Sequence, residues 1–151
     1  MTAGPEPLVR RARIEEVRAL ASEYREEVAR RAAPGERWEP PLPQGGVFWI
    51  AEEPADRDPL GYAGGRLAPE GLTIGPVFVR SGARRAGIGD ALLTAIQQWA
   101  EGTRVPVVEV SVAVDNEAGR AFLEANGYVP RRLLFSLTPE ARREHTTPDA
   151  D

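Results

Sequence analysis

The chain has 151 residues, a length that suits one domain with a single hydrophobic core. It contains no cysteine, so disulfides, cysteine zinc sites and thiol nucleophiles are excluded. Its single histidine, His145, lies in a polar C-terminal stretch, so we expect no metal site. A formal net charge of -4 disfavours nucleic acid as a partner and mildly favours a cationic one.

The sequence has neither an apolar run of membrane-spanning length nor a signal-peptide pattern. We therefore expect no membrane association and cytoplasmic residence. Residues 1–151 should form one domain with its core at about 8–137. A loose leader over residues 1–7 and a flexible tail over about 138–151 complete the expected organisation.

The first predicted elements are a strand at 8–13 and a helix from residue 15 to about residue 30, where apolar residues recur at helical spacing. Pro34-Gly35 should end this helix. Residues 36–46 contain three further prolines, which excludes regular helix or central strand. This segment is either a surface connector or a substrate-side loop in which Trp38 walls a pocket.

The remaining chain predicts a sheet with two more helices. Gly75-Pro76 interrupts one strand, and proline forfeits a ladder hydrogen bond, so this pair belongs at an edge or a bulge. Asn126-Gly127 should cap the last helix. The predicted strands are 47–51, 60–67, 72–79, 105–114 and 128–137, and the predicted helices start near residue 84 and span about 116–125.

A glycine turn joins the strand at 72–79 to the helix that follows it. The first N–H groups of a helix have no internal partner and carry partial positive charge. Gly87 and Gly89 would let a phosphate or pyrophosphate reach those groups, although they could instead serve close packing of the helix. Mobile positive charge is expected from the three arginines of the turn, Arg80, Arg84 and Arg85.

The spacing from Arg84 through Gly87 to Gly89 resembles the Arg/Gln-x-x-Gly-x-Gly/Ala pyrophosphate loop of the GNAT N-acetyltransferase superfamily. Downstream, Asn116 and Gly127-Tyr128 resemble the second signature of that family, Asn-x-x-Ala-x-x-x-Tyr-x-x-x-Gly-Phe, and follow in the family order. The resemblance implies an α+β fold. Its central sheet would be mixed, mostly antiparallel, splayed between strands 4 and 5 and flanked by helices.

The resemblance also implies that acetyl-CoA is the acyl donor. The main chain at Phe78 and Val79 would pair with pantetheine, and Asn116 would hydrogen-bond near the cofactor arm. Two alternatives stay open: Asn116 caps its helix, and Phe78 and Val79 are only core. The amides that would hold the pyrophosphate belong to Arg84, Arg85, Ala86, Gly87, Ile88, Gly89 and Asp90.

Three positions that carry acids or bases in members of the family are altered here. Leu123 stands where the family has a tyrosine acid, and it cannot donate a proton. Thr73 and Ser111 stand where different members carry a glutamate base. The usual acid–base pair is therefore missing, and the oxyanion donor would be a backbone N–H such as that of Val79.

Other side chains are candidates for the missing roles. We select Glu109 and Ser111 as catalytic candidates because alternation places both on one strand face, although Glu109 could be only an exposed carboxylate. Further candidates are Glu52 and Glu53 for the base and Tyr62 and Tyr128 for the acid.

Two functions follow from the resemblance. The first is an acetyl-CoA-dependent N-acetyltransferase that relies on proximity and water-mediated proton transfer in a ternary complex. The alternative is a catalytically impaired acyl-CoA-binding or interaction module of the same fold, and a purely structural protein is a third possibility. The amine acceptor is not readable, beyond faint signs of a cation and an aromatic-walled mouth. A homodimer is possible, as is common in the family.

Overall fold

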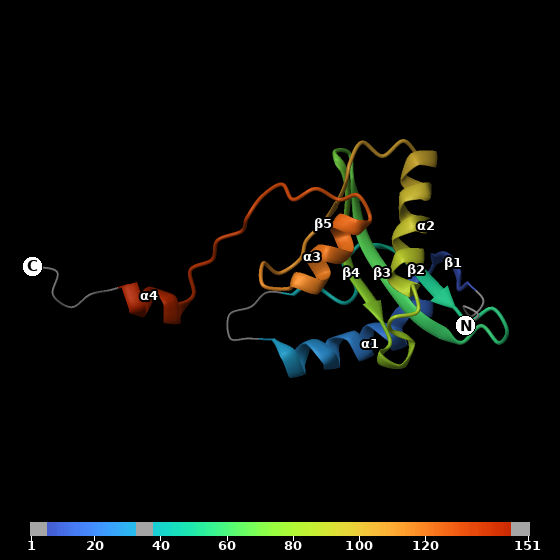
Figure 1. Cartoon of the computed structure of the whole chain (residues 1–151), viewed down its shortest axis with the longest axis horizontal. Helices are drawn as coiled ribbons and strands as arrows, with labels where there is room; N and C mark the ends of the chain where they lie inside the picture. The colour runs from blue at the N-terminus through green and yellow to red at the C-terminus, as the bar shows by residue number, and fades with distance from the viewer. Residues whose placement is uncertain (1–5, 33–37, 146–151) are drawn as a thin grey trace, which may run out of the picture.

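A computed structural model of the chain describes residues 6–32 and 38–145 (Figure 1). The sheet has the order β1-β2-β3-β4-β5, with antiparallel neighbours except for the parallel pair β4–β5. This confirms the predicted α+β class. The strands are β1 (Leu8–Ala12), β2 (Val47–Glu52), β3 (Pro59–Ala68), β4 (Gly71–Val79) and β5 (Val108–Val110). The helices are α1 (Ile14–Arg31), the 3-10 turn η1 (Ser81–Ala83), α2 (Ile88–Gly102), α3 (Glu117–Ala125) and α4 (Pro139–His145).

The two long helices belong to different hydrophobic clusters of the sheet. Because side chains alternate along a strand, Trp49 joins the cluster of α2 whereas its neighbour Ile50 joins that of α1. Leu72 and Ile74 of β4 also join the α2 cluster. The α2 helix contributes a stripe of side chains to it, namely Ile88, Leu92, Leu93 and Ile96. Among the described residues, no helix has the length and apolar character needed to cross a membrane.

The sheet opens between β4 and β5. The two strands pair only from Leu72 to Ile74, whereas β4 continues to Val79. Gly75 and Pro76 stand between the paired residues Ile74 and Val77, opposite a single residue of β3. This is the bulge predicted at Gly75-Pro76. Beyond it, the described part of the chain offers β4 no partner on the β5 side.

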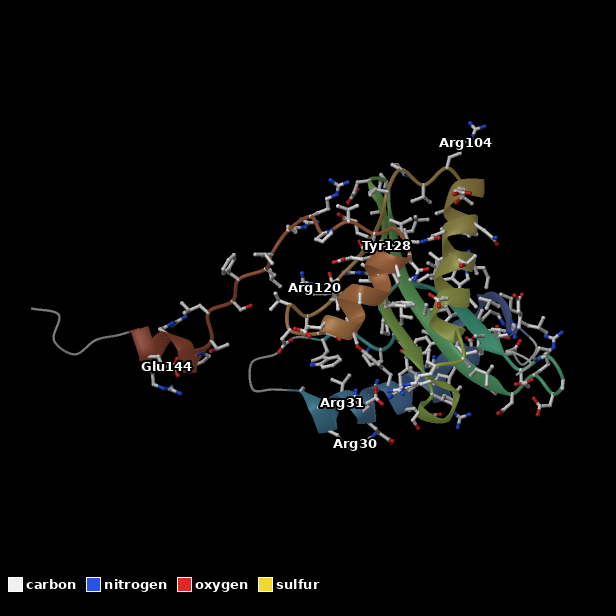
Figure 2. All side chains as sticks on the ribbon, in the orientation of Figure 1. Arg30, Arg31, Arg104, Arg120, Tyr128 and Glu144 are labelled. Atoms are coloured by element: carbon white, nitrogen blue, oxygen red, sulfur yellow. The ribbon has the colours of Figure 1, made fainter. Side chains whose placement is uncertain are left out.

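Two predicted strands differ in the structure. The strand predicted at 105–114 is reduced to Val108–Val110, and residues 128–137 form no strand. A strand needs a neighbour for its ladder, and β4 supplies one over three residues only. Figure 2 shows Tyr128 beside the end of α3, after which the chain leaves the body toward α4, which carries Glu144. The short helix α4 lies within the tail predicted at about 138–151.

The other predicted elements agree with the structure to within a few residues. The first helix ends at Arg31, and the N–H of Ala32 bonds to the carbonyl of Val28 at 2.8 Å. Pro34-Gly35, the beginning of the predicted leader and the last six residues lie outside the described residues.

Candidate functional site

A cavity of about 190 Å³ lies at the N-terminal end of α2. Its lining brings together seven of the ten residues predicted to contact the acyl donor, and it adds Phe122 of α3. The sequence marks Phe122 only as an apolar position of a helix, so its place at this cavity depends on how α3 packs. The lining residues are Val79, Arg84, Arg85, Gly87, Ile88, Gly89, Asp90 and Phe122.

The backbone at the start of α2 leaves amide groups without helical partners. Gly87 is the N-cap residue, and no side chain caps the helix there. The first helical hydrogen bond runs from the N–H of Ala91 to the carbonyl of Gly87, at 3.0 Å. The N–H groups of Ile88, Gly89 and Asp90 therefore precede the helical ladder, at the positive end of the helix dipole.

The two glycines of the turn have different reasons for lacking a side chain. Gly87 has φ of 78°, and a Cβ there would meet no atom within 4 Å. At Gly89 a Cβ would lie 3.2 Å from the ring of Phe122. Gly89 thus allows α3 to approach α2 closely, whereas Gly87 provides a left-handed backbone beside open space.

Two of the three arginines of the turn are held by α1. The Nε of Arg80 lies 3.0 Å from Glu23, and a terminal nitrogen of Arg84 is paired with Glu27. The prediction of mobile charge is therefore wrong for Arg80 and Arg84. Arg85 lines the cavity, and within the described ranges no carboxylate pairs with it.

The end of β4 presents backbone groups toward the opening of the sheet. The N–H of Arg80 bonds to the carbonyl of Leu60 in β3 at 2.9 Å. Antiparallel alternation then directs the N–H and carbonyl of Val79 away from β3. In agreement, that carbonyl accepts a hydrogen bond from the Nε of Arg84 at 2.9 Å.

Three predicted donor-site residues do not line the cavity. The Phe78 side chain is buried, with its ring centroid 5.9 Å from that of Tyr24. Ala86 is exposed in the turn. The Oδ1 of Asn116 accepts a hydrogen bond from the N–H of Gly119 at 2.9 Å, so Asn116 caps α3.

Of the two catalytic candidates, only Glu109 lies on β5. Glu109 stands beside Thr73 in the parallel register, and its Oε1 lies 3.4 Å from Arg132. Ser111 follows the end of β5 and is exposed, so it does not share a strand face with Glu109. Leu123 is buried in the core, as an apolar side chain at this position should be.

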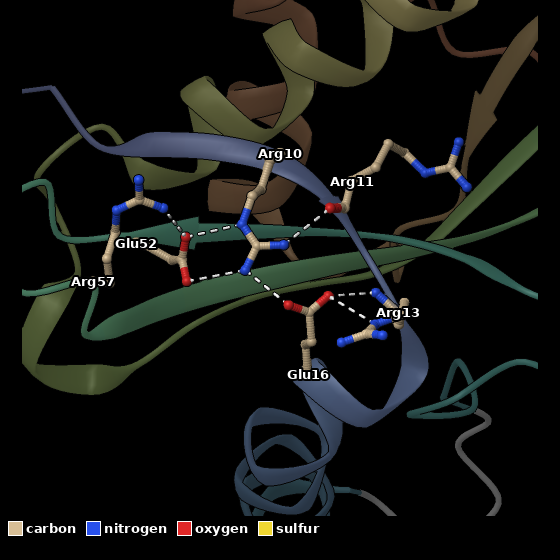
Figure 3. Close-up of polar contacts among 6 residues, drawn as sticks. All are labelled: Arg10, Arg11, Arg13, Glu16, Glu52 and Arg57. Atoms are coloured by element: carbon tan, nitrogen blue, oxygen red, sulfur yellow. Dashed lines mark hydrogen bonds and ion pairs between the residues drawn. The ribbon is translucent and has the colours of Figure 1, made fainter.

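The carboxylate of Glu52 forms ion pairs with two arginines (Figure 3). Its side chain is buried, and its Oε1 lies 3.1 Å from the Nε of Arg10 and 3.4 Å from Arg57. The strand β2 that carries it is separated from β4 by β3. These contacts give Glu52 a structural role between β1 and β2.

The two tyrosines named as acid candidates differ in their hydrogen bonding. The Tyr62 hydroxyl donates to the carbonyl of Pro41 at 2.6 Å, and burial raises its pKa well above the usual value. The Tyr128 hydroxyl is buried and has no hydrogen-bond partner among the described residues.

One carboxylate near the opening was not singled out from the sequence. Glu39, in the segment predicted as a possible substrate-side loop, packs against Gly75 at the bulge of β4. A Cβ added to Gly75 would lie 2.7 Å from the Cδ of Glu39 and 2.9 Å from its Oε2. Only the prolines and Trp38 around it marked this loop in the sequence, and Trp38 itself is 41% exposed.

Comparison with known proteins decides the family. The sequence profile of the family described as "Acetyltransferase (GNAT) family" matches residues 14–128. The chain belongs to the GNAT acetyltransferase family. No curated protein matches the chain.

Solved structures share the GNAT fold of this chain. A probable acetyltransferase is 20% identical, with a TM-score of 0.66 over 87% of this chain and 95% of its own. An acetyltransferase of Trypanosoma brucei is 14% identical, with a TM-score of 0.62 over 88% of this chain and 99% of its own. AAC(6')-Iy, in complex with the bisubstrate analog CoA-S-monomethyl-acetylneamine, is 14% identical, with a TM-score of 0.60 over 89% of this chain and 99% of its own.

Members of this GNAT family use acyl-CoA donors, and the residues of the cavity suit such a donor. Uncapped amides and the guanidinium of Arg85 complement a pyrophosphate. The free side of β4 can receive an extended arm as a further strand.

Proposed function

We propose that the protein is an acetyl-CoA-dependent N-acetyltransferase that acts on a primary amine of a small molecule or peptide by direct attack in a ternary complex. The observation that carries this proposal is the cavity at the uncapped start of α2, which lies next to the end of β4. In this arrangement the N–H groups of residues 88–90 and the side chain of Arg85 hold the pyrophosphate.

The thioester is placed by the end of β4. The pantetheine arm runs along residues 75–79, where β4 lacks a strand on its β5 side among the described residues. The N–H of Val79 points into this opening and donates to the oxyanion that forms at the thioester carbonyl. Phe122 and Gly89 border the same cavity and fix its shape.

Titration calorimetry with acetyl-CoA, propionyl-CoA and succinyl-CoA tests the donor site. We expect acetyl-CoA to bind and to stabilise the fold by about 2.7 kcal/mol at one hundred times its Kd. The same donors, mixed with a panel of primary amines and peptides, should release free CoA thiol, fastest with acetyl-CoA. Secondary amines and alcohols serve as control acceptors, and with them we expect no release of the CoA thiol.

The alternative is a catalytically impaired acyl-CoA-binding module. It is favoured by Thr73, Ser111 and Leu123, which stand at the positions of the usual base and acid. Binding heat with acetyl-CoA but no thiol release across the panel would establish this alternative. Absence of binding would exclude both functions.

A further inference from the structure

Thr73, which stands where some members of the family carry a glutamate base, lies on the β4 face that is turned away from α2. Leu72 and Ile74 belong to the hydrophobic cluster of α2, so the side chain between them, Thr73, points to the opposite face. A Cβ at Gly75 would meet the side chain of Glu39, so the loop that contains Glu39 covers this same face of β4. The carboxylate of Glu39 therefore lies two residues along β4 from Thr73.

The backbone of this loop is held at two places by buried phenols. The hydroxyl of Tyr24 in α1 donates to the carbonyl of Glu39 at 3.1 Å. The hydroxyl of Tyr62 in β3 donates to the carbonyl of Pro41 at 2.6 Å. Burial, reinforced by the negative charges of Glu39 and Glu27, raises the pKa of Tyr24 to about 12, so it stays a donor at neutral pH.

The carboxylate of Glu39 is available to a ligand. It is half-buried, and no cation within the described ranges pairs with it. The adjoining strands carry two charged groups. Arg66 of β3 stands opposite Thr73 in the strand register, and Glu109 of β5 forms an ion pair with Arg132. A protonated amine that entered here would meet a negative charge that no cation of residues 6–32 and 38–145 pairs with, beside the opening of the sheet.

We propose that Glu39 receives the acceptor ammonium and takes its proton, a role that rests on the proposed N-acetyltransferase function. One N–H bond of R–NH3+ breaks and an O–H bond forms on Glu39. The freed lone pair attacks the thioester carbonyl carbon, and the carbonyl electron pair moves onto oxygen. Collapse of this intermediate forms the amide and breaks the C–S bond; the CoA thiolate takes up one proton, the amide nitrogen releases one, and Glu39 returns its proton to water.

Glu39→Gln tests this role because it keeps the shape of the side chain and removes its charge. We expect kcat/KM for a primary amine to fall about 100-fold at pH 7. The loss should shrink as the pH approaches the pKa of the amine, since the neutral amine needs no base. The Kd of acetyl-CoA should not change. Glu26→Gln on α1, an exposed residue with the same charge change, is the matched control and should behave as the wild type.

Gly75→Ala provides a second test that leaves Glu39 in the sequence. The new methyl group would overlap the end of the Glu39 side chain, which can rotate away without unfolding the protein. We expect a KM for the amine raised by at least tenfold, with a smaller change in acetyl-CoA affinity. Correct folding of each variant is checked by its circular dichroism and melting temperature.

The outcomes separate this inference from the proposed function. Wild-type turnover together with unchanged kcat/KM in Glu39→Gln across pH 6–9 would overturn the role of Glu39 and leave the N-acetyltransferase intact. Acetyl-CoA binding without turnover by the wild type would overturn the proposed function and the role of Glu39 with it. A loss in Glu39→Gln that stays constant with pH would contradict proton transfer to Glu39.

Discussion

Gly87 combines a left-handed backbone with open space in front of it. In Gly87→Ala we expect a stability loss of about 1 kcal/mol, because a side chain is strained at positive φ. We also expect the shift in melting temperature caused by acetyl-CoA to disappear, since the methyl group would enter the open space proposed for the pyrophosphate. Differential scanning fluorimetry with and without acetyl-CoA measures both effects.

Gly82 is the matched control for this experiment. It lies in the same turn, has no positive φ, and a Cβ there would meet no atom within 4 Å. Gly82→Ala should therefore keep the full acetyl-CoA shift. An equal shift in Gly87→Ala and Gly82→Ala would contradict an anion site at the start of α2.

Glu16 makes the free energy of unfolding depend on pH in the acidic range. Its carboxylate accepts from Arg10 at 2.9 Å and from the N–H of Arg13 at 2.7 Å (Figure 3). The hydrogen bond from Arg10, followed by that from the Arg13 backbone, lowers the pKa of Glu16 from 4.5 to about 2. The stabilisation is therefore complete above about pH 4.5 and is lost as the pH falls toward 2.

Urea unfolding of Glu16→Gln at pH 2 to 6 checks this contribution. The wild type should be the more stable protein at pH 6, and most of the difference should be lost by pH 2, where about half of its own folded carboxyl is protonated. Glu26→Gln should show no such convergence. A wild-type advantage that is the same at pH 2 and pH 6 would be inconsistent with the ion pair as its cause.

At the scale of elements, the turn between β4 and α2 is fixed by α1. Glu23 and Glu27 lie one helical turn apart and bind Arg80 and Arg84. Both pairs are partly exposed, so we expect Glu27→Gln to cost only about 0.5 kcal/mol of stability. The Kd of acetyl-CoA should nevertheless rise about threefold, because binding must then order the turn.

Titration calorimetry at two salt concentrations measures this effect. The rise in Kd should be smaller at high salt, where the ion pair of the wild type is already weakened. Glu26→Gln, on the same helix, should leave the Kd unchanged. A Kd for Glu27→Gln equal to that of the wild type would show that the turn is ordered without α1.

The element order could be read from local patterns because each long element buries one face. Helical spacing of apolar residues located α1 and α2, and Gly75-Pro76 located the bulge. The strand predicted at 128–137 was wrong because alternation describes compatibility with a sheet and does not supply a neighbouring strand. The site shows the same division. Arg85, Gly87 and Gly89 lie within five consecutive residues at the start of α2, whereas Phe122 reaches the cavity, and Glu39 reaches Gly75, only through packing.

At the scale of the whole molecule, the segment before α4 exposes large apolar side chains. Three consecutive residues are largely exposed, namely Leu133 (69%), Leu134 (84%) and Phe135 (87%). A single exposed apolar residue is ordinary on a protein surface, whereas a contiguous exposed apolar patch is typical of an interaction site. We expect this segment to associate with a second copy of the chain. Size-exclusion chromatography with light scattering should show a dimer that dissociates on dilution. Leu134→Ser with Phe135→Ser should be monomeric, and a wild type that stays monomeric at high concentration would contradict the association.

The helix α1 reaches two loops that lie far apart in the sequence. Within five residues, Glu23, Tyr24 and Glu27 contact Arg80, the carbonyl of Glu39, and Arg84. The spacing between the β4–α2 turn and the carboxylate proposed to meet the amine is therefore set by a little more than one turn of a single helix. A small rotation of that helix would move both loops together, so substitutions on its surface could couple the affinities for the two substrates without touching either.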